Sequence, residues 1–485
     1  MLTRLRVNGF KNLVDVDVRF GPFTCIAGAN GVGKSNLFDA ILFLSALADK
    51  SLTEAALSVR SAGDLGGDPL GIFFGGGDYE GARIRMIAEM ILPPTAVDDL
   101  GQRAEATITF VEYEIELGLR PPTDEYPVAD IAILREGLRP IKLGDATERL
   151  RFAHRPAWRR SVLAGRRTSP FISTKTVSGH VQIKRHQDGT GGRTASLAAA
   201  SLPRTVLSSA TSSESPTALI AKREMQSWRL LQLEPSHLRE PDDYYVGMAS
   251  LDASGRHLPT MLYRLDRGDL PDEPGATLTT LANRLNELVR ETHSLSIDRD
   301  DARRRTTLYL HDRSGGKFPA RALSDGTLRF LALLALDLDP EASSLLCLEE
   351  PENGIHPERV ETILEVLAEM ATDPREPVGE DNPSRQVLIN THSPLVVKKV
   401  SADDLVVVEL EACVVWGHLA RVPRFRAADG SWRASAGAEP ISPAKVKRYI
   451  GAVPRAMGKH PGGTAASGQT VEEKYQQTLA FDAAS

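Results

Sequence analysis

Residues 23–35 read FTCIAGANGVGKS, and this stretch decides the fold. An apolar segment runs into the spacing Gly28-x-x-x-x-Gly33-Lys34-Ser35, and a helical pattern of apolar residues follows it. This is the P-loop pattern in its required strand–loop–helix context. The glycines let backbone N–H groups turn inward around phosphate oxygens, and the dipole of the following helix favours the same anions. The stretch therefore predicts an α/β fold with a nucleoside triphosphate site. An ordinary glycine-rich turn is the alternative.

The residues of this loop predict how a nucleotide would be held. Lys34 would reach the β- and γ-phosphates, and the Ser35 hydroxyl would bind Mg²⁺. The motif defines a triphosphate site, but neither its base nor its purpose. The candidate cofactor-binding residues of the loop are Gly28, Asn30, Gly31, Gly33, Lys34, Ser35 and Asn36.

Length and composition set the class of protein. The 485 residues suffice for one large domain with an insertion, or for two or three domains, and the 41% hydrophobic and 25% charged residues are typical of a soluble globular protein. No apolar run reaches the roughly 18 residues of a membrane span, and no signal-peptide core is found at the start. Three distant cysteines without a CxxC pair argue against zinc and disulfides. We expect a cytoplasmic protein with no membrane partner.

A second stretch, SLLCLEEPENGIHPERV at 344–360, ends an apolar run in two adjacent acids. The run is typical of a fully buried strand of a parallel sheet, and open α/β sheets bind ligands at the carboxyl ends of such strands. Glu349 is placed to hold a metal ion, and Glu350 to orient or deprotonate an attacking water. A solvated strand end, which often carries acids, is the alternative.

Two weaker motifs flank this strand. At 323–327, LSDGT opens an apolar helix, where Ser324 and Gly326 offer a hydroxyl and bare backbone N–H groups to an anion; a plain helix cap is the alternative. Further on, an apolar strand at 386–390 ends in Thr-His-Ser-Pro. There His392 could donate to a γ-phosphate, although a lone histidine is more often an ordinary surface or core residue.

The order of these motifs resembles the ABC-type ATPase heads of the SMC and RecF group. The resemblance is closest to the bacterial "AAA family ATPases" related to RecF and to the OLD-type enzymes, and it is strong over residues 1–48 and 318–410. It implies an α/β P-loop NTPase, an ABC-type head with a mixed sheet and a large insertion between the P-loop and the signature motif. It also implies ATP and Mg²⁺ as cofactors, and a pair of heads that clamps two ATP molecules.

The resemblance assigns roles residue by residue. It makes Glu349 the Walker B acid, in place of the usual aspartate, Glu350 the catalytic glutamate, and His392 the switch histidine at the γ-phosphate. The residues that cap the partner's ATP in trans are Ser324, Asp325 and Gly326. The D-loop corresponds to 351–354. The further candidate nucleotide contacts are Lys11 and Asn12.

One part of the family pattern is missing where we expect it. The family usually has a glutamine that bridges metal and water, between the P-loop strand and the insertion. Residues 66–90 contain none, and Gln102 lies in a strand-like segment further on. The stretches WRLLQLEPSHLREPDD at 228–243 and LTTLANRLNELVRETH at 278–293 also resemble the family, and we interpret the second, which is amphipathic, as head core or a lobe connection. Slow hydrolysis would be one consequence of a missing glutamine.

We divide the chain into four parts. The N-terminal lobe with the P-loop spans 1–139, a basic and partly disordered insertion 140–275, the C-terminal lobe with signature, Walker B and switch histidine 276–420, and an extension with a flexible tail 421–485. No sustained heptads predict a coiled coil. The segment at 194–218 has low complexity and is expected to be mobile.

Residues 149–204 carry twelve Lys or Arg and one acid, Asp188. Phe152, Trp158 and Phe171 are interleaved with these charges, which is typical of a nucleic-acid surface. Docking of an acidic protein and a solvated loop are the alternatives.

Two functions fit the sequence. The first is an ATPase that closes as a dimer or higher oligomer and acts on or senses DNA, in genome maintenance or anti-phage defence beside an effector such as a nuclease. The alternative is a slow ATPase scaffold that gates assembly with a partner protein, such as a nuclease or toxin, without binding DNA. The acid set of the TOPRIM nuclease that follows the head in OLD-type relatives is not found after His392.

Overall fold

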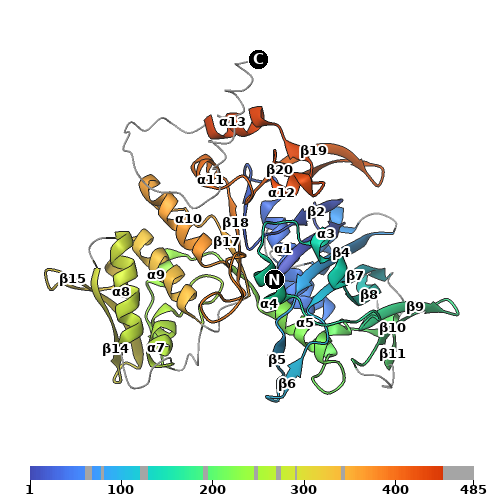
Figure 1. Cartoon of the computed structure of the whole chain (residues 1–485), viewed down its shortest axis with the longest axis horizontal. Helices are drawn as coiled ribbons and strands as arrows, with labels where there is room; N and C mark the ends of the chain where they lie inside the picture. The colour runs from blue at the N-terminus through green and yellow to red at the C-terminus, as the bar shows by residue number, and fades with distance from the viewer. Residues whose placement is uncertain are drawn as a thin grey trace.

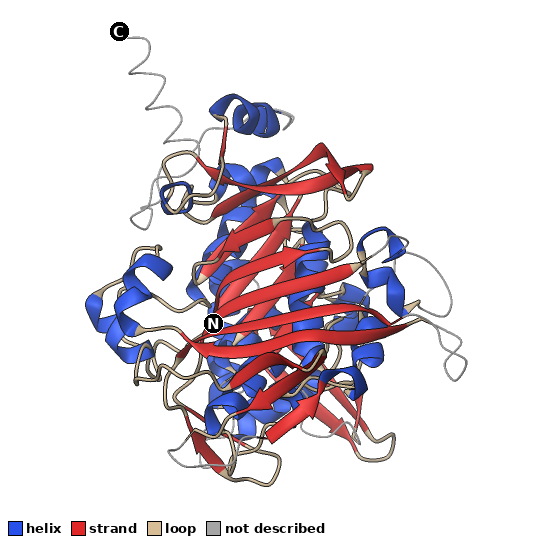
Figure 2. Ribbon diagram, turned by 90° about the vertical axis from the view of Figure 1, so that its right-hand side faces the viewer, coloured by secondary structure: helices blue, strands red, loops and turns tan. Residues whose placement is uncertain are grey.

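The computed structural model describes residues 1–59, 68–77, 81–120, 129–188, 195–244, 250–268, 275–289, 292–339 and 344–451. Two large sheets organise this part of the chain (Figures 1 and 2). No helix in these ranges is long and apolar enough to cross a membrane.

The first sheet has eight strands, and its paired neighbours are antiparallel. Its strand order is β11 (Ala195–Ala198), β10 (His180–Arg185), β9 (Ile172–Val177), β8 (Asp130–Pro140), β7 (Phe110–Arg120), β4 (Arg83–Ile91), β1 (Leu2–Asn8) and β2 (Val16–Arg19). Along β1 and β4 buried and more exposed residues alternate in part, as expected for a sheet with one face on the core. Figure 2 shows the broad face of this sheet.

The second, central sheet is mixed. Its strand order is β12 (Trp228–Leu231), β17 (Leu345–Glu349), β18 (Gln386–Thr391), β3 (Phe23–Ala27), β19 (Leu405–Val415), β20 (His418–Ala428) and β21 (Pro440–Ile441). The first five strands pair in parallel, and β19 and β20 form an antiparallel hairpin. Every residue of β3 and β18 is buried, as expected for strands covered on both faces, which explains the apolar residues at their centres. The strands predicted from the P-loop, Glu-Glu and Thr-His-Ser motifs are confirmed.

The helix that follows the P-loop, α1 (Lys34–Leu47), lies between the two sheets. Its apolar residues join one core cluster with Leu5 and Met86 of the first sheet and Ile26 and Leu388 of the second. A helix covered on both sides needs apolar residues around its whole circumference, and the sequence of α1 has them. The neighbouring helices of this layer are α2 (Leu52–Ser58) and α5 (Pro216–Gln226).

A second core cluster covers the other face of the central sheet. The helices on this side are α6 (Pro235–Leu238), α7 (Leu258–Gly268), α8 (Ala276–Val289), α9 (Asp325–Leu338), α10 (Val360–Glu369), α11 (Pro394–Lys399) and α13 (Pro443–Gly451). A small sheet joins them, made of β13 (Asp242–Asp243), β15 (Arg305–Asp312), β14 (Thr292–Asp300) and β16 (Lys317–Pro319). Figure 1 shows α7, α8 and α9 with β14 and β15 on one side of the central strands, and the N-terminal sheet on the other.

The remaining elements are short. They are β5 (Thr95–Val97), β6 (Arg103–Glu105), α3 (Ala146–Arg149), α4 (Pro156–Val162) and α12 (Trp432–Ser435).

The stretch 140–275 contributes strands to both large sheets. It supplies β9, β10 and β11 to the first sheet and β12 to the central one. Within 194–218, where low complexity predicts a mobile segment, short regular elements occupy 195–201 and 207–209, and α5 begins at 216. Val206, Leu207 and Ala218 of this segment are buried in the core, which explains this order. The four-part division of the chain stays a prediction, and the predicted tail at 452–485 lies outside the described residues.

Candidate nucleotide-binding and catalytic site

The site forms at the carboxyl ends of four parallel strands. Glu349 ends β17 and pairs in register with Asn390 of β18, and the following residue of β18 pairs with Ala27 of β3. On the other side Leu231 pairs with Leu348, so that Gln232 follows directly beside Glu349. Strand register alone therefore sets three polar side chains in a row next to the P-loop.

A cavity of about 440 Å³ opens at this edge. Its lining residues come from the P-loop, the strand ends and one helix of the second layer: Asn30, Gly31, Gly33, Lys34, Ser35, Asn36, Gln232, Glu234, Arg329, Glu349, Glu350, Asn353 and Asn390. The structure thus brings both predicted glutamates and all the predicted P-loop residues except Gly28 into the described lining of one cavity.

The glycines of the P-loop each have a geometric reason. Gly33 is the N-cap of α1 with φ 100°, a left-handed conformation that favours glycine. A Cβ at Gly28 would lie 2.6 Å from the carbonyl oxygen of Val408, so only glycine fits under the loop. A Cβ at Gly31 would meet nothing within 4 Å, which leaves open space over the loop. The loop has the free concave side that phosphate oxygens need.

Lys34 lies across this loop. Its Nζ donates to the carbonyl oxygens of Gly28 at 2.7 Å and Ala29 at 2.9 Å. The side chain is buried, and burial lowers the pKa of its ammonium group, although three glutamates around the site oppose the shift. The ammonium group lies beside the loop whose backbone would hold the phosphates.

Glu349 is oriented from both sides. Gln232 Nε2 donates to its Oε2 at 2.8 Å, and Asn390 Nδ2 donates to its Oε1 at 3.2 Å. Its carboxylate and the Ser35 hydroxyl line the same cavity, and such hard oxygen ligands suit Mg²⁺. Within the described residues no group of three or more His, Cys, Asp or Glu side chains could hold a metal ion. With the Glu349 carboxylate and the Ser35 hydroxyl as its ligands from the lining, a magnesium ion held here would take its remaining ligands from nucleotide phosphates and water.

Glu350 is held in an unusual backbone conformation. Its φ is 45°, and its backbone N–H donates to the carbonyl oxygen of Asn390 at 3.0 Å. Its carboxylate lies 2.6 Å from His392 Nδ1 and accepts a 2.6 Å hydrogen bond from Asn353 Nδ2. Left-handed conformations of non-glycine residues cost free energy and concentrate at functional sites. The two predicted catalytic residues, Glu350 and His392, are thus in direct contact.

The signature residues lie elsewhere. Ser324 caps α9, and its side chain accepts a hydrogen bond from the backbone N–H of Thr327, while Asp325 is paired with Arg239. Ser324, Asp325 and Gly326 line a second cavity, of about 920 Å³, together with Gly354 and Ile355. Among the described residues, the lining of the P-loop cavity includes none of the three signature residues.

Lys11 and Asn12 face α1. Lys11 Nζ donates to Asp39 Oδ2 at 2.8 Å, and Asn12 Oδ1 accepts from Asn36 Nδ2 at 2.7 Å. Neither belongs to the described lining of the P-loop cavity. Both support the P-loop from behind, and a contact with the nucleotide stays a prediction.

Gln232 is the main residue that sequence reasoning missed. The stretch 66–90, where the bridging glutamine is expected, contributes no residue to the described lining of the cavity. Gln232 follows β12, the strand beside β17, far later in the chain, and its part as the bridging glutamine stays a prediction. Gln102, the sequence alternative, is exposed on the β5–β6 hairpin and accepts from Ser212. The available signal was the apolar run of WRLLQLEP ending in glutamine. Asn353 falls in the stretch 351–354 that the resemblance assigns to the D-loop, whereas no sequence signal pointed to a site role for Asn390 or Arg329.

The three aromatic side chains of the basic segment at 149–204 are not exposed at the surface. Phe152 is 5% exposed, and Trp158 and Phe171 are fully buried, so the three cannot stack on bases. Several of its arginines are already engaged with the acids Glu89, Glu376 and Glu214. Arg193 lies outside the described residues.

A P-loop at the carboxyl edge of a mixed sheet, with a pair of glutamates at the end of the next strand but one, is the arrangement of an α/β P-loop nucleotide-binding fold. The chain belongs to the family described as "AAA domain, putative AbiEii toxin, Type IV TA system", whose model matches residues 23–91 and 185–398, more than half of its length. No curated protein matches the chain.

The chain also matches solved structures of SMC heads at low identity. The Smc head bound to the C-winged-helix domain of ScpA is 14% identical, with a TM-score of 0.44, over 87% of this chain and 98% of that one. An Smc head with an extended coiled coil, bound to the C-terminal domain of ScpA derived from Pyrococcus furiosus, is 13% identical, with a TM-score of 0.42 and coverages of 87% and 96%. The SMC head domain from Thermotoga maritima is 12% identical, with a TM-score of 0.33 and coverages of 87% and 98%. Such loose likenesses assign neither a partner nor a substrate.

Proposed function

We propose that the protein hydrolyses ATP with Mg²⁺ and uses it as a switch, in which two heads close on two nucleotides and the closed form acts on DNA beside an effector protein. The observation that carries this proposal is the convergence of the P-loop, the Glu349 cluster and Glu350 on one cavity, with His392 in contact with the carboxylate of Glu350. The family description, which names a toxin–antitoxin system, supports a role in defence.

The side chains divide the chemistry between them. Ser35 and Glu349 would hold Mg²⁺, which supplies charge neutralisation at the phosphates when bound. Glu350 would accept the proton of the attacking water, and His392, in contact with its carboxylate at 2.6 Å, would keep that carboxylate aimed. A positioned general base typically contributes about 10²- to 10⁴-fold in rate.

The separation of the two cavities supports closure by a second copy. Ser324 and Gly326 offer a capped helix N-terminus to an anion, yet they line a different cavity from Lys34 of the same chain. A second chain could supply them to this chain's nucleotide. Hydrolysis would then report assembly, because neither chain alone holds all the parts.

The first experiment is the particle mass of the wild type and of Glu350→Gln with ATP and Mg²⁺. The variant loses the base but keeps the binding residues, so we expect it to accumulate as a dimer or larger closed form with ATP and not with ADP. Lys34→Met is the control that should stay open with either nucleotide. A mass that does not respond to ATP in either protein would refute the clamp.

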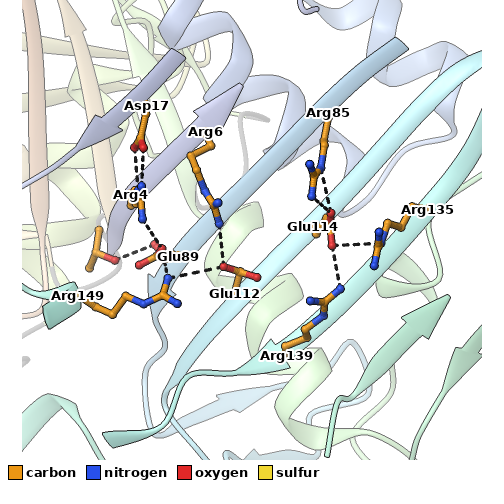
Figure 3. A network of polar contacts seen from close by, with 11 residues as sticks. Arg4, Arg6, Asp17, Arg85, Glu89, Glu112, Glu114, Arg135, Arg139 and Arg149 are labelled. Atoms are coloured by element: carbon orange, nitrogen blue, oxygen red, sulfur yellow. Dashed lines mark hydrogen bonds and ion pairs between the residues drawn. The ribbon is translucent and has the colours of Figure 1, made fainter. Parts of the chain in front are cut away.

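For the DNA part of the proposal, the outer face of the N-terminal sheet is better suited than 149–204. Buried Glu114 is shared by Arg85 at 2.6 Å, Arg139 at 2.9 Å and Arg135 at 3.3 Å (Figure 3). One carboxylate cannot neutralise three guanidinium groups, which are about half exposed and pre-oriented. Such a cluster suits the phosphates of a nucleic acid.

Salt-dependent DNA binding tests this surface. Arg85→Gln with Arg135→Gln should reduce the slope of log K against log salt by about two, in the trapped Glu350→Gln form. Arg166→Gln with Arg204→Gln, in the basic segment, is the matched control and should change it less. Equal affinity in both double variants would remove the sheet face from the proposal.

One observation favours the alternative, a slow ATPase scaffold that gates assembly with a partner protein such as a nuclease or toxin. The tip of the β19–β20 hairpin exposes Leu419 at 81%, Val414 at 71% and Trp416 at 44%. Exposed apolar side chains gathered in one place often mark a protein interface. Partner co-purification that survives nuclease treatment and fails in Leu419→Ser would favour the scaffold, whereas loss on nuclease treatment would favour DNA.

A further inference from the structure

A buried arginine reaches the P-loop cavity from the signature helix of the same chain. Arg329 lies in the second turn of α9, is 7% exposed, and lines the cavity together with Lys34 and Ser35. Arg329 and Lys34 are the cationic residues of the described lining. The same lining holds three acids, Glu234, Glu349 and Glu350. None of the proposed steps uses Arg329.

Its guanidinium group is poorly satisfied. Nη1 lies 3.5 Å from the carbonyl oxygens of both Glu350 and Pro351, at the outer limit of a hydrogen bond. Nε has no hydrogen-bond partner within the described part of the chain. Buried polar groups are normally bonded, so an exception calls for an explanation such as a missing ligand. Burial lowers the pKa of Arg329 from its ordinary value, although Glu234, Asp325 and Glu352 oppose the shift.

The position of the group says which ligand fits. The two carbonyl oxygens belong to the catalytic glutamate and to the residue after it, so the guanidinium group lies at the hydrolytic end of the cavity. A nucleotide with its magnesium ion would bring further negative charge to a cavity that already holds three acids. A planar guanidinium group is suited to phosphate oxygens and is always charged.

We propose that Arg329 binds the terminal phosphate of the nucleotide held by its own chain and thereby positions the signature helix. The proposal rests on the proposed function, because it assumes ATP in this cavity. α9 begins one residue after Ser324, and Arg329 follows Ser324 by five positions, a rise of about 7 Å along a helix. About one and a half turns of α9 therefore connect the hydrolytic end of the P-loop cavity to the cavity that the signature residues line. Loss of the phosphate would release the helix that caps the partner's nucleotide.

The test compares ATP with ADP in the Glu350→Gln protein, by calorimetric titration with Mg²⁺. Arg329→Met should weaken ATP binding about 10- to 100-fold, as expected for a lost charge-assisted hydrogen bond, while ADP binding changes less than about threefold. Arg329→Lys keeps the positive charge but not the planar geometry, so its ATP affinity should lie between those of the parent protein and Arg329→Met. This variant replaces Arg329→Met in the test if the methionine variant does not fold. Equal weakening of both nucleotides, or of neither, would overturn the proposal.

A matched control is available in an arginine that contacts the other end of the same helix. Arg385 is also buried, and its guanidinium group donates to the carbonyl oxygens of Asp337 and Asp339 at the other end of α9. Arg385→Met should lower the melting temperature but leave the ratio of ATP to ADP affinity unchanged. A changed ratio there would mean that any damage to α9 has this effect, which would also overturn the assignment.

The positioning role has its own readout. With ATP raised until the site of Arg329→Met is filled, the variant should still not form the closed assembly that Glu350→Gln forms alone. Normal assembly at saturating ATP would overturn the coupling through α9. A parent Glu350→Gln protein that binds no ATP would instead refute the proposed function itself, so the two failures are distinguishable.

Discussion

Replacing Gln232 by leucine tests the part of the site that the structure adds to the sequence. Gln232 directly follows β12, and its Nε2 donates to Glu349 Oε2 at 2.8 Å. Leucine has a similar size but no donor, so it removes this bond and keeps the packing. Glu349 would keep the bond from Asn390 at 3.2 Å but lose the donor at its Oε2. Its carboxylate would be less firmly oriented in the cavity that Ser35 also lines.

The size of the effect follows from the type of bond. A hydrogen bond to a charged group contributes about 1.5–3 kcal/mol net. Since about 1.4 kcal/mol corresponds to a factor of ten, loss of this bond should lower the apparent affinity for Mg²⁺ about 10- to 100-fold. Because the bond orients a metal ligand and touches no phosphate, we expect this loss in the apparent Mg²⁺ affinity more than in ATP affinity.

The assay is steady-state ATP hydrolysis against Mg²⁺ concentration at saturating ATP. Gln232→Leu should need more Mg²⁺ for half-maximal rate and recover part of its rate at high Mg²⁺. Gln102→Leu, an exposed glutamine on the β5–β6 hairpin, is the matched control and should behave as the wild type. An unchanged Mg²⁺ dependence in Gln232→Leu, with only a lower melting temperature, would refute the reasoning and return Gln232 to a packing role.

Three further outcomes are expected. Glu136 is fully buried, and burial raises its pKa from 4.5 to about 7, so its protonated form contributes stability that is complete below pH 4.5 and lost as the pH rises through 7. The free energy of unfolding of the wild type relative to Glu136→Gln should therefore fall by about 3 kcal/mol from pH 4 to 8. A difference that does not change with pH would contradict this. Gly28→Ala should abolish ATP binding and lower the melting temperature, because its Cβ would lie 2.6 Å from a backbone carbonyl oxygen, whereas Gly71→Ala, which meets nothing within 4 Å, should do neither. Lys11→Met should change ATP affinity less than about threefold, because its ammonium group is held by Asp39 at 2.8 Å; a loss as large as that of Lys34→Met would make it a nucleotide ligand after all.

Local pattern was sufficient for half of the site. The P-loop and the strand that ends in Glu349 and Glu350 are continuous stretches, each with its own apolar run and its own chemistry, so the sequence predicts them without knowledge of strand order. Helix α9 and its cap at Ser324 follow in the same way, because an N-cap serine before an apolar helix is a local signal.

The other half depends on strand order, which a single sequence does not reveal. Gln232 is functional only because β12 pairs with β17, and Arg329 only because α9 packs against the loop after Glu350. The basic segment was misleading for the same reason. Their position among charged residues predicts that Trp158 and Phe171 are exposed and stack on bases. Both are buried in the fold instead, and the spacing of charges along the sequence does not reveal this burial.

The connection of β12 gives Gln232 a second consequence. Its backbone N–H donates to the carbonyl oxygen of Ala253 at 2.8 Å, and that of Glu234 donates to Ser254 at 2.9 Å. These bonds fasten the segment after β12 to the residues that lead into α7, on the side of the central sheet that carries α9. A change at the metal would therefore reach the signature side through two separate routes, Gln232 and the chain after it, and Arg329 with α9. Substitution of either Gln232 or Arg329 should weaken ATP-dependent assembly. If both routes act on the same closing motion, the double variant should assemble no more weakly than the weaker of the two single variants.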